Sequence, residues 1–383
     1  MNQSNLRKVT RLAAWTMLLC CAIVASTEAE SSLKPFLETQ YGYEDNILQV
    51  PEENGPRKDF ISIIRTGIYM NTHLDEKTRC SARYEVAFRK FNDFDSSNRM
   101  DHLLSLLLFR KLRHNISFIT HGDLGLRSQP NDSINNYYKQ SFATQALVQW
   151  NTLWLSQFGM QFRHKSYPYN DRSNYSSLML EGELGRRMSV FSQIRAGYLF
   201  RAYQGAIDPR VLQLESNEKM GGIRQTTNIS FENMLSEKVL MNLRYQFELD
   251  IATKALQSQT GFPRLEKQTG EFEGEYKDFD FDEDKDFNFM NHQVEVMLAY
   301  RLFSRSSVAM YARHDSKFYN DWLVSMTDSQ RHDNLTLLQI YLKQRLSSDL
   351  SLRLQYSLEK NKSNDPTQRY TDNIYSIGLR YGF

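Results

Sequence analysis

Apolar and polar side chains alternate at every second position in many short stretches of this sequence. In the stretch from Leu350 to Leu358 the even-numbered residues are leucines and a tyrosine, whereas the odd-numbered ones are serines, an arginine and a glutamine. The stretch from Leu243 to Ile251 has the same pattern, with charged residues or glutamine at every polar position. Because successive side chains of a β-strand point to opposite faces, this alternation predicts strands with one apolar and one polar face.

Less strict alternation extends the prediction along the rest of the chain. We predict about sixteen strands, within a range of about 14 to 18, because some stretches carry apolar residues on both faces. Besides the two clearest stretches, the predicted strands are Leu37 to Tyr43, Phe60 to Leu74, Cys80 to Phe88, Leu103 to Leu112, Ile116 to Leu126, Tyr138 to Trp150, Phe158 to Phe162, Leu178 to Leu184, Val190 to Ala202, Thr227 to Leu235, Val294 to Leu302, Val308 to Asp315, Leu335 to Leu346 and Tyr375 to Phe383.

The predicted connections alternate between short and long. Outer-membrane barrels have short periplasmic turns and longer extracellular loops, so the alternation predicts an all-β fold, a single transmembrane antiparallel β-barrel. Short turns are predicted at Asp75 to Lys77, Lys111 to His114, Asn151 and Thr152, Arg186 and Arg187, Ser236 to Lys238, Phe303 to Ser306, and Ser347 to Asp349. Long polar connections are predicted at Glu44 to Lys58, Asn92 to Asn98, Ser128 to Asn136, Ser166 to Asn174, Gln204 to Gly222, Ala252 to Phe289, Ser316 to His332 and Glu359 to Asp372.

The apolar faces have the length of membrane-crossing strands. Many extend over about nine residues, which a tilted strand needs to cross a bilayer, and aromatic residues collect near strand ends, where they suit the lipid headgroup boundary. A soluble secreted β-protein is the alternative, because any sheet with one solvated face also alternates. The aromatic residues near strand ends are Tyr43, Phe60, Phe88, Trp150, Tyr375 and Phe383.

Composition favours strands over helices as the membrane-crossing elements. Hydrophobic residues make up only 40% of the 383 residues, whereas 13% are aromatic. After residue 30 there is no apolar run of about 18 residues, the length that a spanning helix needs. The 47 Lys and Arg nearly balance the 45 Asp and Glu, so bulk charge indicates no nucleic-acid partner. Cys80 is the only cysteine after residue 30, which excludes an internal disulfide framework there.

The N-terminal residues have the pattern of a secretory signal peptide. Basic residues precede an apolar stretch from Leu12 to Ala25 that is too short to span a bilayer, and small residues follow it. The sequence therefore predicts a signal peptide over 1–29 and a barrel over 30–383. A lipoprotein anchor at Cys20 is the alternative, although Leu19 stands where glycine or alanine is usual.

The polar faces of the predicted strands carry many arginines and glutamates. A barrel of about sixteen strands is too wide for side chains to fill, so we expect an aqueous lumen. An excess of arginine there would favour anionic solutes, because guanidinium pairs with carboxylate and phosphate. Alternatively, arginines and glutamates on neighbouring strands simply neutralise one another. The predicted pore-lining residues are Arg83, Glu85, Arg89, Arg163, Glu181, Glu183, Arg195, Arg201, Arg244, Glu248, Arg353 and Arg380.

An open lumen predicts a porin-like channel for small polar or anionic solutes or saccharides. We expect no cofactor, no bound metal and no catalytic residue. One alternative is a barrel enzyme that acts on lipid or lipopolysaccharide: His121 and Asp123 share one strand face, but no serine-hydrolase motif accompanies them. A structural or secretion-partner barrel without a free pore is the other alternative.

The connection from Ala252 to Phe289 is too long for a plain turn. Aspartates occupy every second position from Asp278 to Asp286, and two phenylalanines lie between them. We expect an extracellular hairpin in this connection. A calcium site is the alternative, although the glycine that turns a known calcium loop is missing.

Two segments resemble parts of known outer-membrane barrels. The C-terminal run from Tyr375 to Phe383 resembles the signal that such barrels present to their assembly machinery, with alternating apolar residues and a final aromatic. The matching residues are Tyr375, Ile377, Leu379, Tyr381 and Phe383.

The second segment is Gly42-Tyr-Glu-Asp-Asn-Ile47, near the predicted mature N-terminus. It is similar to the stretch that opens porin-like barrels of the beta-barrel porin 2 type in exopolysaccharide systems, although Glu44 stands where aspartate is commoner. The resemblance implies a Gram-negative outer-membrane location, contact with outer-membrane lipid, and a link to envelope polysaccharide. It supplies no catalytic residue. A simple turn is the alternative, because Asp and Asn favour turns.

Overall fold

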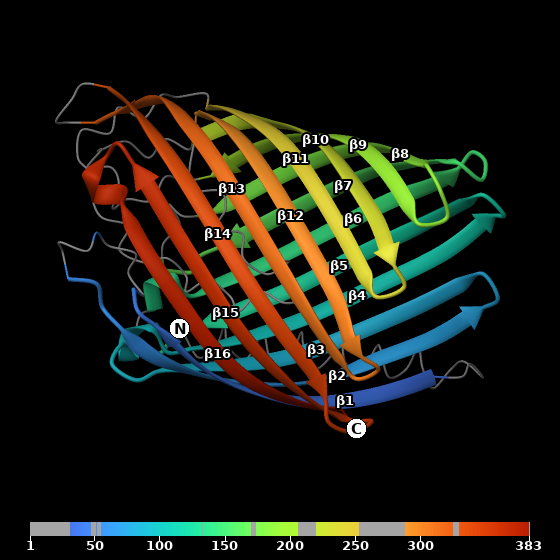
Figure 1. Cartoon of the computed structure of the whole chain (residues 1–383), viewed down its shortest axis with the longest axis horizontal. Helices are drawn as coiled ribbons and strands as arrows, with labels where there is room; N and C mark the ends of the chain where they lie inside the picture. The colour runs from blue at the N-terminus through green and yellow to red at the C-terminus, as the bar shows by residue number, and fades with distance from the viewer. Residues whose placement is uncertain are drawn as a thin grey trace.

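The chain forms a closed barrel of sixteen antiparallel strands, in which β1 (Ser31–Glu44) pairs with β16 (Tyr370–Gly382) to complete the ring (Figure 1). This computed structural model describes residues 31–46, 51, 55–131, 133–169, 174–205, 220–252, 288–324 and 329–382. Within those ranges no helix has the length and apolar character needed to cross a membrane. The predicted fold class and strand number are confirmed.

Each strand pairs with its neighbours in sequence, so the wall is a simple meander. The strands are thirteen to eighteen residues long, more than a tilted strand needs to cross the membrane. Between β1 and β16 lie β2 (Asp59–Asp75), β3 (Thr78–Phe91), β4 (Arg99–Arg113), β5 (Ile116–Ser128), β6 (Tyr137–Gln149), β7 (Trp154–Ser166), β8 (Tyr175–Arg187), β9 (Ser192–Gly205), β10 (Met220–Ser236), β11 (Val239–Ala252), β12 (Phe289–Phe303), β13 (Ser306–Leu323), β14 (Gln330–Arg345) and β15 (Leu350–Ser363).

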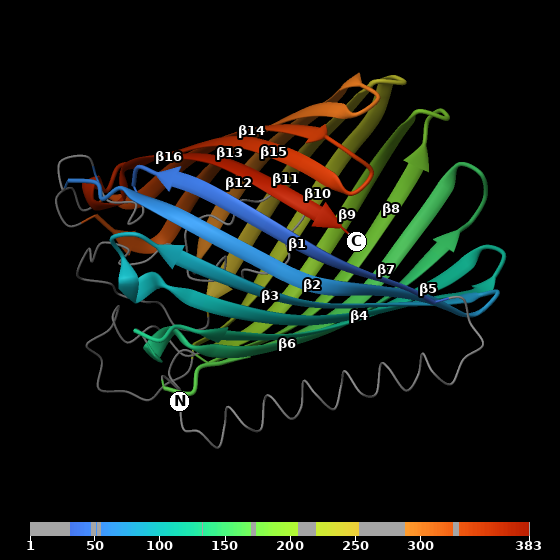
Figure 2. The ribbon, with the colours of Figure 1, turned by 90° about the horizontal axis from the view of Figure 1, so that it is seen from below.

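Short turns join the strands at one end of the barrel and longer connections join them at the other (Figure 2). We call these the inner and outer ends. The turn between β2 and β3 is typical of the inner end. Asp75 accepts hydrogen bonds from the Lys77 backbone N–H (2.7 Å) and the Thr78 hydroxyl (3.0 Å), and these bonds lower the pKa of the Asp75 carboxyl. The predicted sorting of connections is therefore present.

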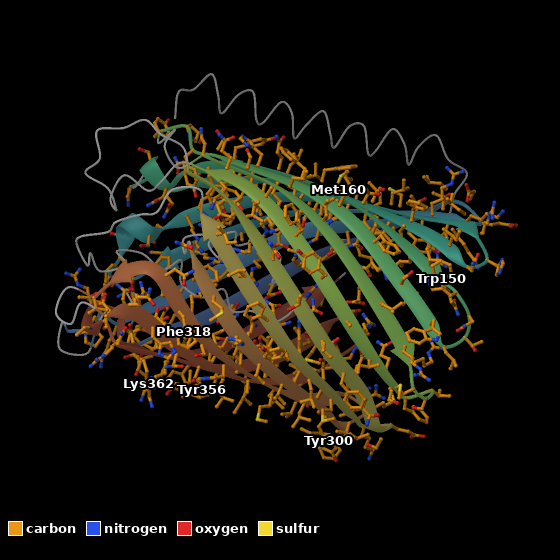
Figure 3. All side chains as sticks on the ribbon, turned by 90° about the horizontal axis from the view of Figure 1, so that it is seen from above. Trp150, Met160, Tyr300, Phe318, Tyr356 and Lys362 are labelled. Atoms are coloured by element: carbon orange, nitrogen blue, oxygen red, sulfur yellow. The ribbon has the colours of Figure 1, made fainter. Side chains whose placement is uncertain are left out.

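The wall has the reverse of the burial pattern of a soluble protein. Large apolar side chains lie exposed on the outside, as with Phe158 at 55% and Ile377 at 48%, while polar side chains are buried inside. Among the described residues Arg331 is the largest fully buried side chain. Figure 3 shows labelled members of the outer surface, including Trp150, Met160 and Tyr300. An apolar exterior around a polar interior is the arrangement of a membrane-spanning barrel.

A small apolar cluster is the exception inside the barrel. Ile61 and Ile63 of β2, Phe91 of β3 and Ile374 of β16 pack together near the outer end, and Phe94 lies against them. This cluster holds the first outer connections against the wall.

Three predicted connections are wrong in position. The turn placed at Arg186 and Arg187 is strand, since β8 continues through both residues and the chain turns at 188–191. Much of the connections predicted at Ser316 to His332 and Glu359 to Asp372 is also strand. These strands continue beyond the apolar band, where polar residues occupy both faces. Alternation is lost there although the backbone hydrogen bonds continue.

The segment that resembles porin-like barrels closes the ring. Asp45 accepts hydrogen bonds from the Asn373 backbone N–H (2.7 Å) and from its side-chain amide (2.9 Å). Asn46 donates to the Thr371 carbonyl at 3.0 Å. The segment therefore joins the outer end of β1 to β16 rather than forming a free turn.

Candidate functional site

The twelve predicted pore-lining residues all occupy strand positions that point into the barrel. In each strand the apolar exterior residues have one parity and these residues have the other, and the register brings interior residues of neighbouring strands side by side. Their contribution to the passage of solutes stays a prediction. The residues so placed are Arg83, Glu85, Arg89, Arg163, Glu181, Glu183, Arg195, Arg201, Arg244, Glu248, Arg353 and Arg380.

Four of these residues form two ion pairs. Arg83 pairs with Glu85 two residues along β3. Arg195 of β9 lies 3.4 Å from the carboxylate of Glu183 on β8, and both side chains are about a third exposed. These pairs fit the expectation that some arginines and glutamates neutralise one another.

Glu181 and Arg201 have other kinds of partner. The Glu181 carboxylate accepts hydrogen bonds from the side-chain amides of Gln145 at 2.6 Å and Gln157 at 3.2 Å. Arg201 is buried, and its guanidinium lies 3.7 Å from the sulfur of Met179. Neither side chain is a simple open charge on the wall.

Other predicted residues are spread around the ring. Arg380 donates to the Tyr69 hydroxyl at 3.3 Å, near the closing strands. Glu248 lies 3.2 Å from Arg224 on the opposite side. Arg353 lies toward the inner end of β15, where its register partner on β14 is Lys343. The predicted set therefore does not converge on one site.

A group of cations that the sequence prediction largely missed does converge, in the outer half of the lumen. It lies on adjacent strands from β3 to β7, and we call it the basic wall. Asp101 is the carboxylate within it, and Arg127 (2.7 Å) and Arg99 (3.5 Å) share it. Of the group, only Arg89 was predicted. The basic wall comprises Arg89, Arg99, Arg127, Lys139 and Lys165, all buried by neighbouring side chains.

Aromatic contacts and a glycine position these cations. The Tyr137 ring lies between two of them, 4.7 Å from the Arg127 guanidinium and 4.2 Å from the Lys165 ammonium. Gly125 lies beside Lys139 on the neighbouring strand, where an added Cβ would be 2.7 Å from the Lys139 side chain. Absence of a side chain there lets Lys139 lie across β5. A small cavity opens on this wall and is lined by Arg89, Arg127, Lys139 and Tyr137.

The wall from β10 to β14 has its charges paired instead, and we call it the paired wall. Asp250 is completely buried and accepts hydrogen bonds from Arg224 and from the Tyr203 hydroxyl, both at 2.9 Å. Arg313 bonds to Asp315 at 2.6 Å. Arg331 and Asp333 form a further two-point pair at the outer end. Each of these arginines has a carboxylate on its own or a neighbouring strand.

A larger cavity of about 660 Å³ lies below both walls, toward the inner end of the lumen. Strands β7 to β14 line it, so it extends across much of the ring. Its wall mixes carboxylates, arginines, amides and tyrosines. Charged and aromatic lining residues include Glu181, Glu183, Arg195, Arg244, Glu295 and Tyr311.

The pair His121 and Asp123 lacks the geometry of a serine hydrolase. His121 Nε2 lies 3.0 Å from Asp123 Oδ1, and the Ser141 hydroxyl donates to Asp123 Oδ2 at 2.9 Å. A catalytic serine needs its hydroxyl on the imidazole, which accepts the proton. Here the hydroxyl and the imidazole both bind the carboxylate, so these contacts form a wall network.

Some predictions fall on residues that the structure does not describe. The signal peptide over 1–29 and the final aromatic Phe383 lie outside the described ranges, as does the connection from Ala252 to Phe289 apart from its ends. The other residues of the predicted assembly signal, from Tyr375 to Tyr381, are exposed on the outside of β16.

The barrel is similar to outer-membrane barrels of known structure. OccAB1 of Acinetobacter baumannii is 9% identical, with a TM-score of 0.54, and the match covers 93% of this chain and 98% of that one. The outer membrane channel DcaP of Acinetobacter baumannii is 12% identical, with a TM-score of 0.53, over 93% of this chain and 97% of the other. The chain is an outer-membrane β-barrel.

More distant similarity adds nothing to this barrel's assignment. A bacterial polysaccharide outer membrane secretin is 9% identical over 91% of this chain and 98% of that one, but its TM-score of 0.46 is too low to support an argument. Neither a protein-family model nor a curated protein matches the sequence. The relation of this outer-membrane barrel to the beta-barrel porin 2 type therefore stays a prediction.

Proposed function

We propose that this barrel is an outer-membrane channel for small polar solutes and that it prefers anions. The basic wall is the observation that carries the proposal. Its five cations lie on adjacent strands of the outer half with Asp101 shared by two of them. A wall with an excess of one charge raises the local concentration of counter-ions in a narrow aqueous passage.

The chemistry of the basic wall supports carboxylate- or phosphate-bearing solutes. Guanidinium groups present a planar fork that matches both anions, and ammonium groups add positive charge without that geometry. Tyr137 holds Arg127 and Lys165 in place, so the wall need not reorganise when a solute passes. The paired wall opposite adds few uncompensated charges, which leaves the field of the basic wall dominant in the outer half.

Ion selectivity of the refolded protein in planar bilayers tests this function. Under a salt gradient the reversal potential should show a preference for chloride. Replacing Arg89, Lys139 and Lys165 together by glutamine should remove most of that preference. Lys90→Gln is the matched control, because Lys90 lies next to Arg89 on β3 but is exposed on the outside, and it should leave the potential unchanged.

Two outcomes would contradict the proposal. Absence of stable conductance steps would favour a barrel without a free pore, as in the structural or secretion-partner alternative. Stable conductance with a reversal potential that the triple substitution does not move would show that the basic wall has no part in selectivity.

A further inference from the structure

Three exposed cations gather on the outside of the barrel at the outer end of β15 and β16. Lys360 and Lys362 lie on the exterior face of β15, and Arg369 immediately precedes β16. Tyr370 pairs with Asn361, so Arg369 lies beside Lys362 across the hairpin. We call these three cations the outer basic patch, and Lys362 is labelled in Figure 3.

The patch lies just beyond the apolar band of the exterior. From Leu350 to Leu358 the exterior residues of β15 are apolar or aromatic. At about 3.3 Å per residue and a tilt of about 40°, this run spans about 20 Å along the membrane normal, close to the roughly 25 Å of a barrel's apolar band. The rings of Tyr356 and Tyr375 pack 5.0 Å apart within its upper part. Lys360 therefore begins the headgroup level.

Hydrogen-bonding groups flank the patch, while the nearest carboxylates of its strands point away. Thr336 of β14 and Thr371 of β16 are the register partners of Lys360, and Asn334 is that of Lys362. Asp372 of β16 points into the barrel and is completely buried. Within the described part of the chain, none of the three cations has an ion pair.

Another sector at the outer end of the exterior is different. On β1 and β2 it carries aromatic rings, with Tyr41 stacked on Phe60 at 5.6 Å and Tyr43 tilted against Phe60 at 5.1 Å. Such rings suit any headgroup boundary. The cations of the outer basic patch are thus an addition confined to one sector of the girdle.

We propose that the outer basic patch binds the phosphorylated headgroup of a glycolipid in the outer leaflet. Cations at headgroup depth attract anionic lipid, and guanidinium or ammonium donors with neighbouring hydroxyls form charge-assisted hydrogen bonds to phosphate. The aromatic pair below the patch offers a surface for the first part of the acyl chains. A second copy of the barrel fits this sector poorly, because a two-fold contact would bring cations against cations.

Native mass spectrometry of the full-length barrel in phosphatidylcholine nanodiscs tests the site. The probe is bis-phosphorylated lipid A, compared with lipid A from which both phosphates have been removed. The triple variant Lys360→Gln, Lys362→Gln and Arg369→Gln should weaken binding of the phosphorylated probe at least about tenfold. Lys90→Gln, which removes a single exposed cation on the exterior of β3, should bind as the unmodified barrel does.

The folded state of each variant is checked by its altered migration in unheated gels. As a second variant, Lys360→Arg with Lys362→Arg keeps the charges and should retain binding. Equal retention of the two lipid A forms would overturn the proposal, as would undiminished binding by the triple variant. A change of oligomeric state in the triple variant, with lipid binding intact, would also overturn it and assign the patch to protein contact.

Discussion

The basic wall and the paired wall line the same lumen at the same outer height, yet their charges are arranged differently. In the paired wall Asp250 is shared by Arg224 and Tyr203, and Arg313 has Asp315 to itself. In the basic wall Asp101 serves two arginines, and further cations surround them. The same interior positions thus supply mechanical cohesion on one side and a surplus of positive charge on the other.

This difference shows how a barrel can separate stability from selectivity. Buried ion pairs are hard to remove one partner at a time, because the remaining charge is left in a poorly solvated place. A surplus charge beside water can be removed at lower cost, but its removal changes the field that a solute meets. Substitutions in the two walls should therefore affect different measurements.

The largest effect is expected for Asp250→Asn in the paired wall. It leaves the buried Arg224 without this carboxylate, so the free energy of unfolding should fall by about 3 kcal/mol. Urea unfolding of the barrel in lipid vesicles, followed by tryptophan fluorescence, measures the change. Glu232→Gln is the control, because Glu232 is half-buried and accepts a hydrogen bond from Gln193, and its effect should be below about 1 kcal/mol. Equal effects of the two substitutions would contradict the distinction.

A smaller and different effect is expected for Asp101→Asn in the basic wall. This substitution removes the carboxylate that Arg127 and Arg99 share, so the excess of positive charge increases. The reversal potential under a salt gradient should move further toward the anion limit. Asp45→Asn, at the outer end of the closing strands, should leave it unchanged. A shift toward cation preference after Asp101→Asn would show that the basic wall does not set the field.

The smallest effect is expected for Arg195→Gln combined with Arg201→Gln. These arginines lie below the basic wall, where Arg195 already pairs with Glu183 and is about a third exposed. Water screens such a charge, so anion preference should fall only slightly. The charge-matched comparison is Lys139→Gln with Lys165→Gln, measured in the same bilayers. If the two double variants shift the potential equally, position within the lumen is unimportant.

The sequence predicted the fold well because the membrane imposes a simple rule on each strand. An exterior residue meets lipid and its neighbours in the chain meet water, so parity alone placed all twelve predicted residues inside. Strand ends were less predictable. The strand predicted from Leu103 in fact begins at Arg99, so Arg99 and Asp101 were left outside it.

The basic wall could not be found from the sequence because it depends on register between strands. Asp101 meets Arg127 because these residues are opposite one another on β4 and β5. Lys139 and Lys165 are opposite on β6 and β7, although 26 residues separate them in the chain. Alternation within one strand gives the face of a residue but not its partners. Nor could it predict that Tyr137 lies between two cations.

The closing strands have a further consequence for how the ring is completed. β1 and β16 pair over nine residues, from Phe36 to Glu44, whereas β1 and β2 pair over fourteen. Lateral tension in the bilayer should therefore part the hoop along this shorter join before any other contact of β1. Asp45 and Asn46 act as a clasp at its outer edge, which makes them the last fastening of a newly inserted barrel and the first to be released when it opens.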